Sequence, residues 1–370
     1  SLVGVFLLSD KKIFATGTMR TGGSLLINSL SLHSEITIFN ERVNFFRFFY
    51  DFFEDNNKKN TDRLLSEYSI RLKHRSNINF DAQEVLENIM KRGCTKEVCY
   101  DELMNDLLKQ TKKRIWGEYA NLSWRRIPDF LKMFPNGKVI HVCRDLRGVL
   151  ASYGALSFLP DNLYLNCIFN WIDSIKYINE NRKKLSDNNF MVIKFEDFHS
   201  HPLKIVKSIC KFLDIKFEDV MIQDSTWKDK INENLIKVNV SAHTKKKVYG
   251  FNPERSEAWK NILNNWELAL CDNLAGEYLE QMGYEKFFKS IPSHDLEIGL
   301  DKLNANQYLK TTFINFKQTG ICTDEYPVNP ADPENWSAPN NGFLKFKDSP
   351  AYKNYLKDMK ALKIRLGKEY

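Results

Sequence analysis

The most constraining feature of this chain is a short segment near its start, residues 14–26, which reads Phe-Ala-Thr-Gly-Thr-Met-Arg-Thr-Gly-Gly-Ser-Leu-Leu. An apolar strand leads into a glycine-rich turn and then into a helix, which is the order of a phosphate-binding loop. Gly17 and Gly22 have the spacing of that loop, Ser24 has the place of its hydroxyl residue, and Gly23 stands where ATP and GTP enzymes carry a lysine. The segment predicts an α/β fold that binds a phosphate through backbone N–H groups, without the part that handles a triphosphate.

The composition suits a globular enzyme. With 370 residues, 43% hydrophobic and 13% aromatic, the chain can bury one large α/β core or two smaller ones. No apolar run approaches the roughly 20 residues that cross a bilayer, so we predict no membrane span. The apolar start, residues 1–8, lacks a basic lead and a cleavage site and is interpreted as a strand or packing arm. The net charge of +7 fits an anionic ligand, a nucleic acid or an ordinary surface, but no RNA-binding repeat or zinc finger supports a nucleic-acid partner.

Seven cysteines are scattered along the chain at positions 94, 99, 143, 167, 210, 271 and 322, and no two form a CxxC pair. An odd, scattered set favours reduced thiols, so we predict a cytoplasmic protein. The cysteines and histidines also lack the spacing of metal ligands, and no metal is expected.

Apolar strands alternate with helical stretches, which predicts a mainly parallel sheet flanked by helices. The expected strands are Lys12–Thr16, Ile36–Phe39, Arg114–Gly117, Lys138–Cys143 and Phe190–Phe195. Helical periodicity appears around residues 127–134 and again after Pro202. The charged span 43–112 is predicted to form a helical lobe or lid inserted into the sheet. From about residue 290 proline, asparagine and glycine become common, so we divide the chain into residues 1–289 and an accessory extension, residues 290–370.

A second strand-to-helix motif covers residues 138–152 and reads Lys-Val-Ile-His-Val-Cys-Arg-Asp-Leu-Arg-Gly-Val-Leu-Ala-Ser. Its strand delivers Arg144 to a carboxyl end, where ligands bind in open α/β sheets. Asp145 is placed to cap the next helix, and Ser152 lies on the second turn of that helix. An arginine and a hydroxyl that converge there suit a phosphate monoester. The alternative is a strand-end arginine paired with a carboxylate.

Together the two motifs resemble those of the 3′-phosphoadenosine-5′-phosphosulfate-dependent sulfotransferases, which have a P-loop-like fold. The resemblance runs from about residue 12 to 284. It implies that the first loop cradles the 5′-phosphosulfate and that Arg144 with Ser152 holds the 3′-phosphate. The implied loop residues are Gly17, Thr18, Met19, Arg20, Thr21, Gly22, Gly23, Ser24 and Leu25.

Later segments also look like landmarks of this family. Residues 192–198, followed by Pro202, are similar to its strand, "YEDL" and proline segment, and Trp259 and Gly283-Tyr284 are similar to its C-terminal landmarks. Between them lies a basic loop, residues 241–255, where family members close over the 3′-phosphate. A lysine run is often a solvated face. The resemblance implies instead that the cofactor is contacted by Lys245, Lys246, Lys247 and Arg255.

Three positions depart from the family pattern. Gly23 replaces the first of two hydroxyl residues, but backbone N–H groups remain and we expect binding to survive. Tyr119, in Gly-Glu-Tyr-Ala-Asn, replaces a lysine that many members carry in a "GEKTP" stretch, which leaves more weight on Arg20. Phe195 replaces the usual tyrosine and removes a hydroxyl.

Sulfuryl transfer builds negative charge on the leaving oxygen, and the resemblance places Arg20 where a cation stabilises that charge. The acceptor must also lose a proton. Glu41 follows a predicted strand where sulfotransferases that act on tyrosine or sugars often place a glutamate base, so it is our predicted base; the alternative is an ion pair with Arg42 or Arg47. His141 and His33 are interpreted as structural, and His243 is a weaker alternative base.

Two rival functions are left open. A P-loop nucleotide kinase would need a lysine at position 23 and an acidic metal ligand downstream. An inactive nucleotide-binding homologue would keep the fold and lose turnover. The acceptor, a small molecule, sugar or peptide with a hydroxyl or amine, is not defined, and a homodimer is left open. The aromatic run at 45–50 either lines an acceptor site or packs the lobe, and we favour the core.

Overall fold

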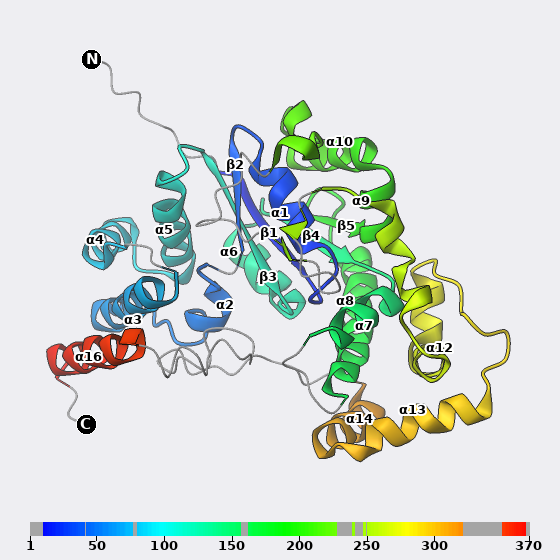
Figure 1. The fold of residues 1–370 in the computed structure, drawn as a ribbon. Helices are drawn as coiled ribbons and strands as arrows, with labels where there is room; N and C mark the ends of the chain where they lie inside the picture. Colours follow the sequence, from blue (N-terminus) through cyan, green and yellow to red (C-terminus); the bar gives the residue numbers. More distant parts are fainter. Residues whose placement is uncertain are drawn as a thin grey trace.

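The computed structural model describes residues 10–40, 42–76, 80–156, 162–227, 239–240, 247–248, 250–320 and 350–367. A five-stranded sheet lies at the centre of these residues, with helices around it (Figure 1). Its strands are β1 (Lys12–Gly17), β2 (Ile36–Asn40), β3 (Ile115–Asn121), β4 (Lys138–Cys143) and β5 (Phe190–Lys194), in the order β2-β3-β1-β4-β5. Every neighbouring pair is parallel. The expected α/β architecture is confirmed.

All five strands lie where the sequence predicts them, and the main difference is in β3. The predicted strand stops at Gly117, but β3 continues to Asn121. The extra residues include a fully buried carboxylate, Glu118, which alternating or apolar patterns do not suggest. Glu118 is held inside the protein because it accepts hydrogen bonds from the backbone N–H of Asn44 and the hydroxyl of Tyr100.

Helices fill the connections. Their bounds are α1 (Gly23–Ser31), α2 (Phe45–Phe48), α3 (Lys58–Ser76), α4 (Ala82–Arg92), α5 (Lys96–Lys109), α6 (Ile127–Met133), α7 (Leu146–Gly154), α8 (Cys167–Lys184), α9 (Phe195–Ser200), α10 (Pro202–Leu213), α12 (Asn265–Gln281), α13 (Ser293–Ala305), α14 (Gln307–Thr319) and α16 (Pro350–Arg365). A two-stranded antiparallel pair, β6 (Asn239–Val240) and β7 (Lys247–Val248), lies outside the main sheet. The span 43–112 is the predicted helical lobe, α2–α5.

The strand order creates one special position at the edge of the sheet. From β1 the chain crosses through α1 to β2 on one side, whereas from β4 it crosses through α7 and α8 to β5 on the other side. The loops that follow β1 and β4 therefore diverge at the carboxyl ends of two adjacent strands. Such a switch point is where open α/β sheets bind ligands.

Two buried clusters hold the fold together. The larger one joins the sheet to the lobe, and its aromatic residues stack closely: the rings of Phe45 and Tyr100 lie 4.3 Å apart. The aromatic run at 45–50 thus packs the lobe, as favoured from the sequence. The second cluster joins α7, α8 and α12 to α13 and α14 through residues such as Leu303 and Leu309. Burial of these apolar side chains supplies the main favourable free energy of folding.

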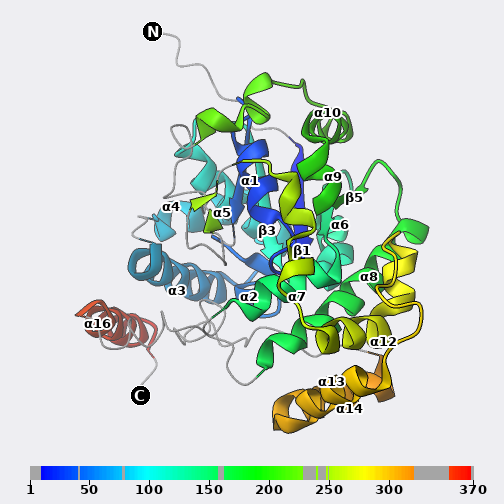
Figure 2. The ribbon, with the colours of Figure 1, turned by 45° about the vertical axis from the view of Figure 1, so that its right-hand side comes forward.

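The C-terminal extension lies on both sides of the molecule (Figures 1 and 2). Its helices α13 and α14 pack on the α8–α12 side, whereas α16 packs against α3 of the lobe. Arg365 of α16 makes an ion pair with Asp62 of α3, and Asp358 contacts Lys73 and His74.

The sequence analysis also made predictions about cysteines, membrane spans and metal sites. The six cysteines among the described residues are buried free thiols; Cys322 lies outside that part of the chain. No helix in the described ranges is long and apolar enough to cross a membrane. In the same ranges no three His, Cys, Asp or Glu side chains gather closely enough to hold a metal ion.

Candidate functional site

The glycine loop between β1 and α1 has the backbone geometry of a tight turn. Arg20 and Gly22 both have positive φ, 68° and 101°. A Cβ at Gly22 would lie 2.7 Å from the Phe195 ring, so only glycine fits this position without a shift. The Thr21 hydroxyl donates to the carbonyl of Thr18 at 2.7 Å and closes the loop. Gly22 is the N-cap of α1 and makes no side-chain hydrogen bond to the helix. The backbone N–H groups of the first turn therefore have no capping side chain.

The second motif meets this loop as the sequence predicts. Arg144 follows β4 directly, Asp145 caps α7, and Ser152 lies on the second turn of that helix. The Nε of Arg20 donates to the Ser152 hydroxyl at 2.8 Å, and an Nη of Arg144 donates to the Arg20 carbonyl at 3.2 Å. The structure therefore brings Arg20, Arg144 and Ser152 together at the switch point.

A third arginine joins them. Arg144 also donates to the carbonyl of Arg255 at 2.9 Å, and both guanidinium groups lie over the ring of Phe195, at 4.0 and 6.0 Å from its centroid. Gly148 leaves room for this arrangement, since a Cβ there would lie 2.7 Å from the Nε of Arg144. We call Arg20, Arg144 and Arg255 the arginine site; the last two lie over Phe195.

The charges of the arginine site are not balanced by protein carboxylates. Among the described residues no Asp or Glu makes an ion pair with any of the three, so the strand-end arginine is not held by a carboxylate. Burial lowers the pKa of all three, and their mutual repulsion lowers it further for Arg144 and Arg255; the pKa of Arg144 falls to about 10. Glu196 opposes the shift of Arg144 from a distance. A concentration of cations without a carboxylate ion pair favours the binding of an anion.

Four buried polar atoms around this site have no hydrogen-bond partner: the hydroxyl oxygens of Thr18 and Ser256, the Nε of Arg144 and the Nε2 of His199. Each of them can donate a hydrogen bond. Buried donors without acceptors are uncommon in folded proteins, and the described residues contain others, such as the Nδ2 of Asn181. Thr18, Ser256 and His199 differ in that they lie on segments beside the three arginines, so their donors fit an anion with several acceptor oxygens.

The surroundings hold the site rigidly. Arg147 forms a two-pronged ion pair with Asp145, with distances of 2.9 and 2.6 Å, and lies over the Trp259 ring. The indole of Trp171 donates to the Arg144 carbonyl at 2.7 Å. Tyr284 donates a hydrogen bond to Glu196, and Glu196 also accepts one from the backbone N–H of Asp145. The two family landmarks, Trp259 and Tyr284, therefore contact the residues that surround Arg144.

The first two departures from the family pattern explain each other. A Cβ at Gly23 would lie 2.2 Å from the ring of Tyr119, and a Cβ at Gly17 would lie 3.3 Å from its hydroxyl. Tyr119 is buried and fills the space beside the loop. Because this ring occupies the position that a side chain at 23 would need, the loop cannot carry the lysine of an ATP or GTP enzyme. This packing disfavours the kinase alternative.

Other predicted residues fall elsewhere. Leu25 is buried in the larger core, and Met19 packs against the second one. Glu41, Lys245, Lys246 and His243 lie outside the described residues, and Lys247 is described only as part of β7. The sequence analysis did not select His199 or Ser256 as site residues. His199 could have been found from its position one helical turn after Phe195. Ser256 could have been found only as the neighbour of Arg255.

The histidines interpreted as structural are buried. His141 contacts the Ser174 hydroxyl through Nε2 at 2.8 Å, and burial lowers its pKa to about 3. His33 contacts the Lys216 carbonyl at 2.9 Å.

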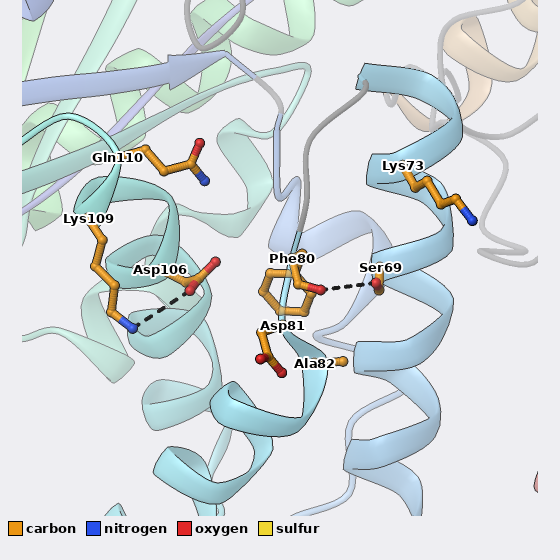
Figure 3. Close-up of a pocket in the computed structure, with 8 residues that line it drawn as sticks. All are labelled: Ser69, Lys73, Phe80, Asp81, Ala82, Asp106, Lys109 and Gln110. Atoms are coloured by element: carbon orange, nitrogen blue, oxygen red, sulfur yellow. Dashed lines mark hydrogen bonds and ion pairs between the residues drawn. The ribbon is translucent and has the colours of Figure 1, made fainter.

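A separate cavity of about 570 Å³ lies in the lobe, between α3, α4 and α5 (Figure 3). We call it the lobe pocket. It is lined by Ser69, Lys73, Phe80, Asp81, Ala82, Asp106, Lys109 and Gln110. Lys109 lies 2.8 Å from Glu84 and 3.7 Å from Asp106, and Asp81 accepts two backbone N–H groups at the start of α4. Lys109 and Asp81 therefore have partners within the protein, whereas Asp106 is only partly compensated, since burial raises its pKa to about 6.

The fold and the arginine site together define the class of this protein. It is an α/β protein whose glycine loop resembles a phosphate-binding loop but lacks the lysine of ATP and GTP enzymes. A family model described as the sulfotransferase family matches residues 12–219, more than half of the chain, and the protein belongs to this family.

Individual relatives are distant. The chain is 24% identical over 155 residues to a protein-tyrosine sulfotransferase of Drosophila melanogaster, a match that covers 39% of this chain and 31% of that relative, so it spans about a third of the relative's length. The sulfotransferase domain of an olefin synthase from Synechococcus PCC 7002 superposes with a TM-score of 0.51 at 17% identity, over 75% of this chain and 96% of that domain. A sulfotransferase domain from the curacin biosynthetic pathway gives a TM-score of 0.49 at 16% identity, over 74% and 97%. The olefin synthase domain shows the same fold.

Proposed function

We propose that this sulfotransferase uses 3′-phosphoadenosine-5′-phosphosulfate and transfers its sulfuryl group to a hydroxyl or amine by in-line displacement. One observation carries the proposal: three arginines without a carboxylate ion pair lie close together after β1 and β4, and the buried donors of Thr18, Ser256 and His199 on the segments beside them have no hydrogen-bond partner. A donor with two separated phosphate groups supplies acceptor oxygens for all of them. When bound, this cofactor supplies the sulfuryl group and a phosphate leaving group.

Each part of the site has a proposed role in holding this molecule. The loop from Gly17 to Ser24 binds the 5′ end with backbone N–H groups at the start of α1. Arg144 and Ser152 bind the 3′-phosphate, together with Arg255 and the basic residues 245–247. Arg20 belongs to the loop and also donates to Ser152, so it links the two regions. We propose that its cation stabilises the charge that develops in the transition state.

The catalytic base is proposed to be Glu41. Glu41 itself lies outside the described residues, but it follows Asn40, the last residue of β2, and the carboxyl end of β2 lies at the same edge of the sheet as those of β1 and β4. Ligands of open α/β sheets bind at this edge, which supports a base from this segment of the chain. Replacement by glutamine, Glu41→Gln, should preserve affinity for the nucleotide and abolish turnover. Unchanged turnover would remove Glu41 from this role.

The acceptor proposed for first testing is a tyrosine hydroxyl in a peptide, because the Drosophila relative is named for tyrosine. Sugars and small phenols are the alternatives. The lobe α2–α5 follows β2 directly, and we propose that it shapes the acceptor entrance. We also propose that residues 1–289 form the catalytic unit and that residues 290–370 brace it, since α13 and α14 pack on α12 and α16 packs on α3. The six buried free thiols support a reducing compartment such as the cytoplasm.

The test of the cofactor is calorimetric. We expect 3′-phosphoadenosine-5′-phosphate to bind at least tenfold more tightly than ADP, since only the former has a 3′-phosphate for Arg144. Equal affinities would contradict the proposal and would favour a nucleotide-binding protein of another kind.

A further inference from the structure

His199 is a buried side chain with a fixed protonation pattern. It lies on α9, four residues after Phe195, and is 2% exposed. Its Nδ1 lies 2.9 Å from the backbone nitrogen of Asn252, which can only donate, so Nδ1 is the acceptor and carries no proton. In the neutral ring the proton is therefore on Nε2.

That Nε2–H has no acceptor. It is one of the buried atoms that have no hydrogen-bond partner among the described residues. Burial of a donor without a partner is unfavourable. A bound group with an acceptor oxygen would remove this cost.

The surroundings of His199 indicate what that partner is. The imidazole lies 4.1 Å from the Phe195 ring, centroid to centroid, on the same ring that carries Arg144 at 4.0 Å and Arg255 at 6.0 Å. The two arginines lie close enough to repel a charge on the histidine. Three donors from α9, the β4–α7 loop and residue 255 are thus gathered around one ring, with no anionic side chain paired to them.

We propose that His199 is a further binding residue of the nucleotide site, whose neutral Nε2–H donates to an oxygen of the phosphate held by Arg144 and Arg255. The inference rests on the proposed function, because it takes that phosphate to be the 3′-phosphate of the nucleotide. Burial, together with the two arginines, lowers the pKa of His199 to about 3. Without a bound anion the ring is therefore neutral at physiological pH, and its Nε2–H is a donor that does not add to the crowding of cations.

Two substitutions separate the two ring nitrogens. In His199→Asn the side-chain oxygen can replace Nδ1 and still accept from Asn252, but the distal donor is lost. In His199→Gln the amide N–H group reaches the position of Nε2. The exposed neighbour His201, exchanged in His201→Asn, is the matched control.

The measurement is the ratio of two affinities, for 3′-phosphoadenosine-5′-phosphate and for adenosine 5′-phosphate, which lacks the 3′-phosphate. For His199→Asn we expect this ratio to fall about tenfold, as for loss of a hydrogen bond to a charged group. His199→Gln should restore part of it, and His201→Asn should leave it unchanged. A general loss of folding would weaken both ligands equally, and circular dichroism of each variant identifies that case.

The outcomes are distinct. If the original protein does not prefer the 3′-phosphorylated nucleotide, the proposed function fails. If it shows the preference and His199→Asn binds both nucleotides as tightly as the original protein does, only the role of His199 is overturned. If a folded His199→Asn protein weakens both nucleotides equally, His199 does not donate to the 3′-phosphate and the phosphate assignment is wrong.

Discussion

The arginine site and the lobe pocket both gather charged side chains, but they balance those charges in different ways. In the lobe pocket Lys109 lies 3.7 Å from Asp106 (Figure 3) and 2.8 Å from Glu84, and Asp81 accepts backbone N–H groups. In the arginine site three cations have no carboxylate partner in the described structure, and nearby donors have no acceptor. The lobe pocket is a sizeable cavity, yet the buried donors without acceptors that support our proposed ligand lie in the arginine site. Unsatisfied chemistry is therefore a better guide to function here than volume.

The largest expected effect tests this difference directly. Arg144→Ala removes a buried cation that lies between the loop, residue 255 and the Phe195 ring, so affinity for 3′-phosphoadenosine-5′-phosphate should fall by about a hundredfold or more. Lys109→Ala in the lobe pocket removes a cation of the same charge and should leave this affinity unchanged. Calorimetric titration of both variants checks the pair. Equal losses in both would mean that the two clusters cannot be distinguished by their partners.

The second prediction concerns the close contact between Gly23 of the glycine loop and the ring of Tyr119. Gly23→Ala places a Cβ against the buried ring of Tyr119, and we expect it to lower the free energy of unfolding by about 1–3 kcal/mol. Gly154→Ala is the control, because a Cβ there meets Tyr164 at an ordinary 3.7 Å. Urea unfolding measures both. A Gly23→Ala protein as stable as the control would show that Tyr119 moves easily and that its packing does not exclude a side chain.

The glycine loop and its surroundings show which parts of the site could be predicted from the sequence. The loop and the Arg144 motif could be predicted because their function depends on local order: strand, turn, helix and a residue at a strand end. Tyr119 and Gly23 appeared in the sequence as two separate departures. Their connection is a contact between a strand and a helix N-terminus that lie about a hundred residues apart, and local patterns do not encode such contacts.

His199 and Glu118 were missed for related reasons. Each is a polar residue whose burial is decided by partners far away in the chain: the backbone of Asn252 for His199, and Asn44 with Tyr100 for Glu118. Hydrophobic periodicity gives no weight to such residues, so β3 was predicted to end too early and His199 was passed over. The lobe pocket could not be predicted from the sequence either, because three separate helices form its walls.

The third prediction uses the pH dependence of the lobe pocket. Burial raises the pKa of Asp106 from 3.8 to about 6, so the folded protein keeps a proton that the unfolded chain has already lost. The carboxylate therefore costs stability above about pH 6, and this cost disappears as the pH falls below about 4. Asp106→Asn should raise the free energy of unfolding by about 1–2 kcal/mol at pH 7 and by little at pH 4. Urea unfolding at both values checks this, and an equal effect at the two pH values would contradict it.

The smallest effect is expected where the extension meets the lobe. Arg365 and Asp62 form a two-pronged pair, with distances of 2.9 and 3.0 Å, but the arginine side chain is half exposed. Solvent screens such a pair, so Arg365→Ala should lower the free energy of unfolding by no more than about 1 kcal/mol, and less at high salt. Nucleotide affinity should not change, because α16 contacts α3 and not the arginine site. Unfolding at low and high salt, with calorimetry on the same samples, tests both statements. A loss of nucleotide affinity would show that α16 acts on the binding site through the lobe, and the two regions would then be coupled.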